Sequence, residues 1–216
     1  NSIRSGDGAI DIAYRMSLRG FSALLFDLRA HGSSGGDRVS AGQYEIDDVL
    51  GAFDYLIQRG VAHDRIGLIG FSFGAGVAIM AAAREPSIRA VVADSPFATV
   101  SELLSQETAR KMPLSVDASS IFLPAAKIMA KHLYGIKVES ISPEKDVSGL
   151  DYPILVIHGM ADTRIEYSHG QRVSDAADVK GEIWLVPGVG HVDAFYAHPG
   201  EYIDRLVDYF SARLNP

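Results

Sequence analysis

The sequence predicts an α/β protein with a doubly wound, mostly parallel sheet that helices cover on both faces. Short apolar runs alternate along the chain with segments of helical period, which is typical of βαβ units. The 216 residues are 47% hydrophobic and 22% charged, and this length suits one domain with one core. Residues 98–150 break the alternation with helix-like pieces and internal prolines. We therefore expect a single domain over 1–216, with 98–150 as a small helical cap.

Each expected element in the first part of the chain has its own local signal. Ile10–Leu18 has helical spacing, and the apolar run Ser22–Asp27 follows it as a strand. After a loop rich in Gly and Ser, Tyr44–Gln58 places six apolar side chains on one face of a helix. Ile66–Ile69 is a short apolar strand, and the alanine-rich Ala75–Arg84 that comes soon after it is a buried helix.

The alternation continues on both sides of the expected cap. Ala90–Ala93 precedes the cap as a short apolar strand, and Pro153–His158 follows it as another. A helix around Ser168–Ala177 then leads to the strand Glu182–Val186. The chain closes with a helix over Glu201–Leu214.

Composition and charge exclude several classes of function. A formal net charge of −7 without a basic stripe argues against a nucleic-acid surface. No apolar run approaches the roughly 20 residues that span a bilayer, so we expect no membrane span. No signal-peptide pattern opens the chain, and we expect a cytoplasmic location. The absence of Cys excludes disulfides, thiolate metal sites and Cys nucleophiles.

Neither a metal nor an organic cofactor is expected. No group of His and carboxylate residues has the spacing of a metal site. No glycine pattern for a phosphate or a dinucleotide stands in the right structural context.

The segment Gly70-Phe71-Ser72-Phe73-Gly74 is the strongest chemical signal. It follows an apolar strand and enters an alanine-rich helix, which is the context of a nucleophile elbow. We expect Ser72 to be a nucleophile, Phe73 N–H to be an oxyanion donor, and both glycines to prevent collisions with the neighbouring backbone. Ser34 lies in a second Gly-x-Ser-x-Gly run, but no helix directly follows that run. Ser34 is therefore the weaker candidate.

A serine nucleophile needs a base, and the base needs an orienting acid. His191 follows the strand Glu182–Val186, so its imidazole can return over the end of the sheet. Two acids are compatible with this position, because Asp162 and Asp94 both follow strands and both precede His191 in the chain. His31 and His158 are expected to hydrogen-bond loops near the site.

The sequence resembles the α/β-hydrolase superfamily over nearly its whole length. Besides the elbow, the resemblance rests on an Asp27–Ser33 loop, an acid loop His158–Asp162 and a histidine loop Gly190-His191. The turn Asp94–Phe97 and the small cap are similar to those of bacterial esterases and serine-aminopeptidase-like hydrolases. The resemblance implies the α/β-hydrolase fold, a serine hydrolase activity and Asp162 as the acid.

The expected reaction is the hydrolysis of a small-molecule acyl ester through an acyl-enzyme. Phe71, Phe122 and Met129 are the candidate substrate-binding residues. One alternative is a serine aminopeptidase or amidase, because the acidic cap residues would suit a free peptide amine: Glu102, Glu107 and Asp117. Another alternative is a non-catalytic binding protein that keeps the fold.

The resemblance also implies a segment that this sequence does not contain. In the family, a strand ending in His-Gly precedes the first helix, and its loop supplies a second oxyanion amide. The same family order places a strand between Ser22–Asp27 and Ile66–Ile69. We therefore expect the native protein to have preceding residues, with N-terminal strands and the second donor outside this chain.

Overall fold

The computed structural model of the protein describes residues 7–111, 124 and 127–214. In this part of the chain, four strands form one parallel sheet in the order β1-β2-β3-β4. The strands are β1 (Leu68–Phe71), β2 (Val91–Asp94), β3 (Leu155–Gly159) and β4 (Glu182–Val186). Parallel neighbours require crossover connections, and helices supply them. The predicted α/β class with a parallel sheet is confirmed.

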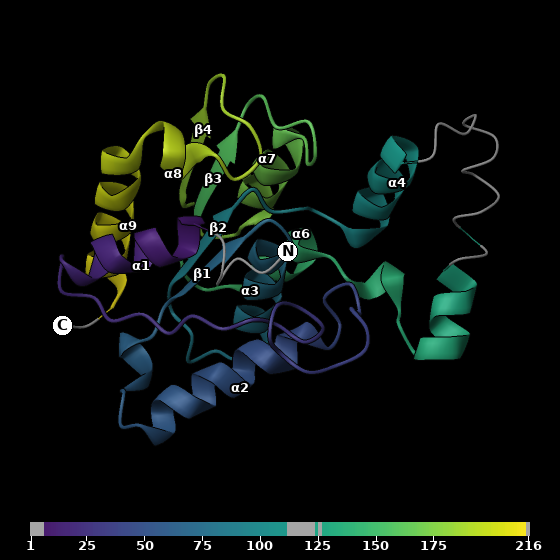
Figure 1. Cartoon of the computed structure of the whole chain (residues 1–216), viewed down its shortest axis with the longest axis horizontal. Helices are drawn as coiled ribbons and strands as arrows, with labels where there is room; N and C mark the ends of the chain where they lie inside the picture. Colours follow the sequence, from purple (N-terminus) through teal and green to yellow (C-terminus); the bar gives the residue numbers. More distant parts are fainter. Residues whose placement is uncertain (1–6, 112–123, 125–126, 215–216) are drawn as a thin grey trace.

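Helices cover both faces of the sheet. Figure 1 shows α1 and α9 on one side of the strands and α3 on the other. The helices are α1 (Asp7–Ser17), α2 (Glu45–Gln58), α3 (Phe73–Arg84), α4 (Val100–Lys111), α6 (Pro143–Asp146), α7 (Tyr167–Ala176), α8 (Ala194–Ala197) and α9 (Pro199–Arg213). Short 3-10 turns are η1 (His63–Arg65), η2 (Val138–Ser140) and η3 (Val147–Gly149). Residues 127–134 are also helical.

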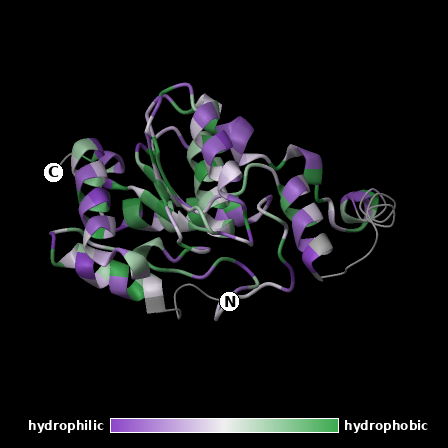
Figure 2. Cartoon of the chain, turned by 90° about the horizontal axis from the view of Figure 1, so that it is seen from above, coloured by the Kyte–Doolittle hydropathy of each residue, from purple (hydrophilic) through white to green (hydrophobic). Residues whose placement is uncertain are grey.

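The core consists of apolar layers on the two faces of the sheet. Along β2, Val91 and Ala93 pack into the layer with α3, whereas Val92 packs into the layer with α9. Val156 and Leu155 of β3 divide between the same two layers. Figure 2 shows the hydrophobic strands between helices whose outer surfaces carry hydrophilic residues. Burial on both faces explains why these strands are apolar without alternation.

Most predicted elements are confirmed with small shifts at their ends. Glu182–Val186 has the predicted bounds, while the strand expected at Ile66–Ile69 is observed two residues later as β1. The shift has a hydrogen-bonding reason. The backbone pairing of this strand with its neighbour begins where Leu68 N–H donates to Ala90 O (2.8 Å).

The strand predicted at Ser22–Asp27 is wrong. These residues form no strand, and in the described residues β1 pairs on one edge only, with β2. Leu24 and Phe26 are 41% and 39% exposed. A local apolar pattern expresses a preference for extended backbone, but a strand also requires a hydrogen-bonded neighbour.

The stretch 98–150, predicted as a cap, has two different parts in the described residues. Figure 1 shows α4 and the helical residues 127–134 standing away from the sheet. The later part returns to the body, because Val147 and Leu150 are buried in the core layer with α3. Of the helices in the described residues, none combines the length and the apolar character that crossing a bilayer requires. The cytoplasmic location stays a prediction.

Candidate active site

The carboxyl ends of the four strands bring the predicted site residues to one edge of the sheet. Ser72 directly follows β1, Asp162 lies beyond the end of β3, and His191 lies beyond the end of β4. The backbone pairing extends past β1, because Ser72 N–H donates to Asp94 O (2.8 Å). In open α/β sheets this edge is where ligands bind.

The turn at Ser72 has a strained backbone held by close packing. Ser72 has φ 53° and ψ −118°, a region that side-chain-bearing residues rarely occupy. A Cβ at Gly70 would lie 2.3 Å from Gly74 O, so only glycine fits there. The prediction for Gly74 is wrong, because a Cβ at that position meets nothing within 4 Å. The second close contact is instead at Gly76, whose Cβ would lie 2.3 Å from the Phe97 ring.

The structure brings Ser72, His191 and Asp162 into one hydrogen-bonded line. Ser72 Oγ lies 2.8 Å from His191 Nε2, and His191 Nδ1 lies 2.6 Å from Asp162 Oδ2. The Asp94 carboxyl has other partners, namely the hydroxyls of Tyr202 (2.9 Å) and Ser95 (3.0 Å). Of the two candidate acids, only Asp162 bonds the imidazole.

The surroundings of Asp162 keep its carboxyl ionised. Burial alone would raise its pKa, but hydrogen bonds from His158, His191 and Ile165 N–H outweigh burial and lower the pKa below the usual value. Its Oδ1 accepts the N–H groups of Arg164 (2.8 Å) and Ile165 (2.9 Å). An ionised carboxylate only accepts hydrogen bonds, so His191 Nδ1 carries the proton. Nε2 is therefore free to accept the serine hydroxyl.

The two histidines predicted to hydrogen-bond loops near the site, His31 and His158, both do so. The buried His158 ring bonds the Ile165 carbonyl through Nε2 (2.9 Å). His31 Nδ1 bonds the Arg29 carbonyl (2.8 Å), and its ring stacks on Phe73 with centroids 6.0 Å apart. Both rings therefore support loops beside the site.

The acid loop and the histidine loop are in direct backbone contact. Ala161 N–H donates to Val189 O at 2.9 Å. A Cβ at Gly159 would lie 2.3 Å from Val189 O and 2.4 Å from Gly190 O. Glycine at this position allows the close approach. It brings the segment that ends in His191 against the end of β3.

The remaining predicted residues have different surroundings. Phe73 begins α3, where N–H groups lack partners within the helix, so its amide is available beside Ser72. Phe71 is 8% exposed and packs in the layer with α1 and α9. Met129 is 57% exposed, and Phe122 lies outside the described residues. Substrate binding by Phe71, Phe122 and Met129 stays a prediction.

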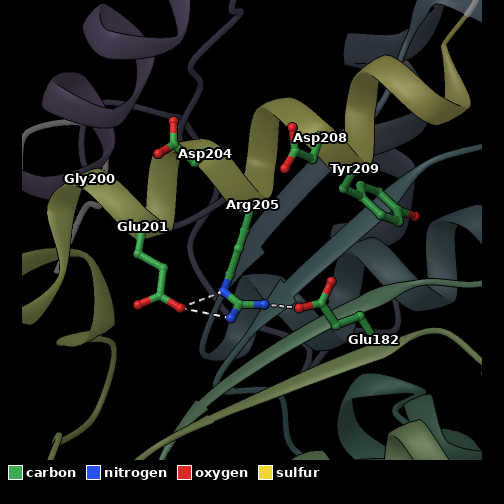
Figure 3. A pocket seen from close by; sticks show the side chains of 7 residues that line it. All are labelled: Glu182, Gly200, Glu201, Asp204, Arg205, Asp208 and Tyr209. Atoms are coloured by element: carbon green, nitrogen blue, oxygen red, sulfur yellow. Dashed lines mark hydrogen bonds and ion pairs between the residues drawn. The ribbon is translucent and has the colours of Figure 1, made fainter.

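A separate surface hollow lies between the start of β4 and one side of α9 (Figure 3). Its lining residues are Glu182, Gly200, Glu201, Asp204, Arg205, Asp208 and Tyr209. Glu182 is the first residue of β4, whereas His191 follows the last residue of that strand. Arg205 bonds both Glu182 and Glu201.

Within the described residues, no three side chains of His, Cys, Asp or Glu gather as they would around a metal ion.

Sequence reasoning missed the buried partners of Asp94. The sequence presents Asp94 as a second candidate acid and gives no indication of a partner at Tyr202. The two residues are 108 positions apart, so no local spacing links them. The nearest signal is that Tyr202 follows the histidine loop in a helix with one apolar face.

The strand order, the helical layers and the hydrogen-bonded Ser, His and Asp define an α/β hydrolase. The chain belongs to the prolyl oligopeptidase family, whose model matches residues 14–216.

A curated relative matches most of the chain, and solved structures have the same fold. The chain is 28% identical over 204 residues to the uncharacterized protein YfhR of Escherichia coli K12, which covers 92% of this chain and 63% of the relative. The Pyrococcus furiosus esterase Pf2001 superposes with a TM-score of 0.78 at 24% identity, over 100% of this chain and 80% of that one. The α/β hydrolase GrgF from Penicillium sp. sh18 superposes with a TM-score of 0.74 at 19% identity, over 97% of this chain and 86% of that one. This chain thus spans less than two thirds of the length of YfhR.

Proposed function

We propose that this protein is a serine hydrolase that cleaves carboxylic esters of small molecules through an acyl-enzyme. The observation that carries the proposal is the line from Ser72 Oγ to His191 Nε2 (2.8 Å) and from His191 Nδ1 to Asp162 (2.6 Å). A serine hydroxyl is a poor nucleophile at neutral pH unless a base removes its proton. In this role His191 is the base and Asp162 orients it.

In the acylation step, Ser72 Oγ attacks the ester carbonyl carbon while His191 Nε2 takes the hydroxyl proton. The carbonyl oxygen becomes an oxyanion, and Phe73 N–H donates a hydrogen bond to it. His191 then gives its proton to the alcohol oxygen, the ester C–O bond breaks and the alcohol leaves. The acyl group remains on Ser72.

Deacylation repeats this chemistry with water in place of the serine. His191 takes a proton from water, the resulting hydroxide attacks the acyl carbon, and the proton passes to Ser72 Oγ as the carboxylic acid leaves. Asp162 stays ionised throughout and stabilises the imidazolium that forms in each step.

The ester preference is supported by the likeness to Pf2001, which is named an esterase. The family match favours a second candidate, cleavage of a peptide or amide bond. The acidic cap residues do not favour a site for a peptide amine. Glu102 pairs with Arg172 (2.8 Å), and Glu107 pairs with Arg110 (2.7 Å). Asp117 lies outside the described residues.

The first test is Ser72→Ala assayed on short p-nitrophenyl esters. We expect turnover to fall by roughly 10⁶-fold, because the variant has no nucleophile. Ser34→Ala is the matched control: it removes the serine of the second Gly-x-Ser-x-Gly run, and turnover is expected to stay at the wild-type level. Unchanged turnover in Ser72→Ala would end the proposal.

A fluorophosphonate probe separates an enzyme from a non-catalytic binding protein. We expect the probe to label the wild type at Ser72 and to leave Ser72→Ala unlabelled. A wild type that resists labelling would favour the binding protein.

Comparing kcat/KM for an aminoacyl p-nitroanilide with that for a p-nitrophenyl ester then decides between peptidase and esterase.

A further inference from the structure

We propose that Asp94, Ser95 and Tyr202 form a buried network that positions the loop of the base His191. The inference rests on the proposed function, because the orientation of His191 matters only if His191 acts as the base. The three residues act as positioning residues, since none of them bonds the imidazole.

The network is a continuous chain of hydrogen bonds. Val192 N–H donates to Ser95 Oγ (3.2 Å), and the Ser95 hydroxyl donates to Asp94 Oδ1 (3.0 Å). The Tyr202 hydroxyl donates to Asp94 Oδ2 (2.9 Å). Asp94, Ser95 and Tyr202 are at most 1% exposed. Water therefore does not compete for these bonds.

The negative charge of Asp94, at the centre of the network, fixes which group donates in each hydrogen bond. Burial raises the pKa of Asp94 to about 6, and hydrogen bonds from Tyr202 and Ser95 act in the opposite direction. At neutral pH the group is a carboxylate, which accepts both hydroxyl protons. Since the Ser95 proton points at Asp94, the Ser95 lone pairs are left for Val192 N–H.

The loop at Val192 needs such a bond because its backbone is strained. Val192 directly follows His191 and has φ 59°. A β-branched residue at positive φ is a genuine outlier, and such conformations persist only where the surroundings hold them. Ser95 also has positive φ, 53°. One hydrogen bond, from Val192 N–H to Ser95 Oγ, thus joins two turns with strained backbones beside the base His191.

The same strand end also reaches the nucleophile. Asp94 O accepts Ser72 N–H (2.8 Å), while the Asp94 side chain reaches Val192 through Ser95. Tyr202 is fixed in turn by its edge-on contact with Phe195 (5.6 Å between centroids). Asp94 at the end of β2 is therefore connected to the backbone of Ser72 and, through Ser95, to the residue that follows His191.

The test compares Ser95→Ala and Tyr202→Phe with the wild type. In each variant we expect kcat on a p-nitrophenyl ester to fall by about 10- to 100-fold, because a misplacement of about 1 Å has effects of this size. We expect KM to stay within about twofold, since substrate binding does not use this network. The rate of fluorophosphonate labelling at Ser72 is expected to fall by the same factor as kcat.

The matched control is Tyr209→Phe on the same helix. The Tyr209 hydroxyl accepts Val91 N–H and donates to Pro153 O, each at 3.0 Å, with no link to the histidine loop. Tyr209→Phe therefore loses the same group, and we expect it to keep the wild-type kcat. The double variant Ser95→Ala/Tyr202→Phe is expected to lose less than the product of the single losses, because both act through Asp94.

Hydrogen exchange at the Val192 amide gives a readout that does not depend on activity. We expect this amide to exchange at least about tenfold faster in Ser95→Ala than in the wild type. Wild-type kcat and labelling rates in both single variants, or an unchanged Val192 amide, would overturn the inference. A wild type that the probe does not label overturns the proposed function instead, and the exchange result still decides whether the network holds the loop.

Discussion

Two buried aspartate carboxyl groups lie at the ends of neighbouring strands, but their hydrogen-bond partners and the direction of their pKa shifts differ. Asp94 ends β2 and Asp162 follows β3, with exposed fractions of 1% and 5%. Burial raises the pKa of Asp94 to about 6. Asp162 is also buried, but donors that include His158 and His191 lower its pKa below the usual value. The number and charge of the donors, and not burial alone, decide the sign of the shift.

The comparison explains how one sheet edge can use two acids for two purposes. Asp162 accepts backbone amides on one oxygen and the His191 imidazole on the other. The Asp94 carboxyl accepts one hydroxyl on each oxygen, from Ser95 and from Tyr202. In the proposed mechanism, Asp162 stabilises charge on the base, while Asp94 holds the backbone that carries the base.

The largest expected effect separates the two acids directly. Asp162→Asn should lower kcat by about 10⁴-fold, because the amide no longer fixes the tautomer of His191. Asp94→Asn should lower kcat by only about 10- to 100-fold, because it disturbs position and leaves the tautomer intact. Steady-state kinetics on a p-nitrophenyl ester measure both values. The comparison fails if Asp94→Asn is the more damaging change.

The close approach at the end of β3 makes the next prediction. In Gly159→Ala the new Cβ meets Val189 O at 2.3 Å, so the histidine loop has to shift. We expect kcat to fall by about 10²-fold and the free energy of unfolding to fall by about 1–3 kcal/mol.

Gly51→Ala is the control for this substitution. Gly51 lies within α2, and its new Cβ meets nothing within 4 Å. Removing a helical glycine there should raise the free energy of unfolding by about 0.5–1 kcal/mol and leave kcat unchanged. Urea unfolding and the ester assay test both variants, and equal activity losses would contradict the assigned contact.

The sequence predicts most of this fold because its signals are local. Glu182–Val186 is a strand with the predicted bounds, and the elbow at Ser72 has the predicted strained backbone. Each motif carries its own structural context, and parallel strands bring their ends to one edge. Chain order alone leaves Asp94 and Asp162 as candidate acids, and the resemblance to the α/β-hydrolase acid loop selects Asp162.

The strand prediction that fails, and the contact that was missed, depend on non-local partners. The strand expected at Ser22–Asp27 has no neighbour with which to form a ladder in the described residues. A backbone collision predicted at Gly74 is absent, because the close backbone contact of this turn falls on a Cβ at Gly70, 2.3 Å from Gly74 O. The bond from Tyr202 to Asp94 joins residues 108 positions apart. Such contacts cannot be predicted from the spacing of residues within a short segment.

The pH dependence of stability provides a third prediction, with opposite signs for the two acids. The pKa of Asp94 is raised on folding to about 6, so ionisation opposes folding above that pH, and the opposition disappears as pH falls. Between about pH 7 and pH 5, the wild type should gain roughly 1–2 kcal/mol in free energy of unfolding relative to Asp94→Asn.

Asp162 has the opposite sign. Its folded pKa is lowered, so its contribution is present above its unfolded pKa of about 4 and is lost as pH falls below that value. Urea unfolding of wild type, Asp94→Asn and Asp162→Asn from about pH 7 down to about pH 3 separates the two acids. A wild-type advantage over Asp94→Asn that shrinks between pH 7 and pH 5 would contradict the raised pKa.

The smallest expected effect is at the hollow between the start of β4 and α9, where Glu201 is exposed. Glu201 pairs with Arg205 at 2.7 Å, but its side chain is 48% exposed (Figure 3). Solvent screens such a pair, so Glu201→Gln should change the free energy of unfolding by less than about 0.5 kcal/mol. We expect kcat to stay at the wild-type level, because this hollow adjoins the start of β4 and the proposed base follows its end. A tenfold loss of kcat would show that the ion pair at Glu201 affects the adjacent Tyr202 in the first turn of α9, and the hollow and the candidate active site could no longer be treated as independent.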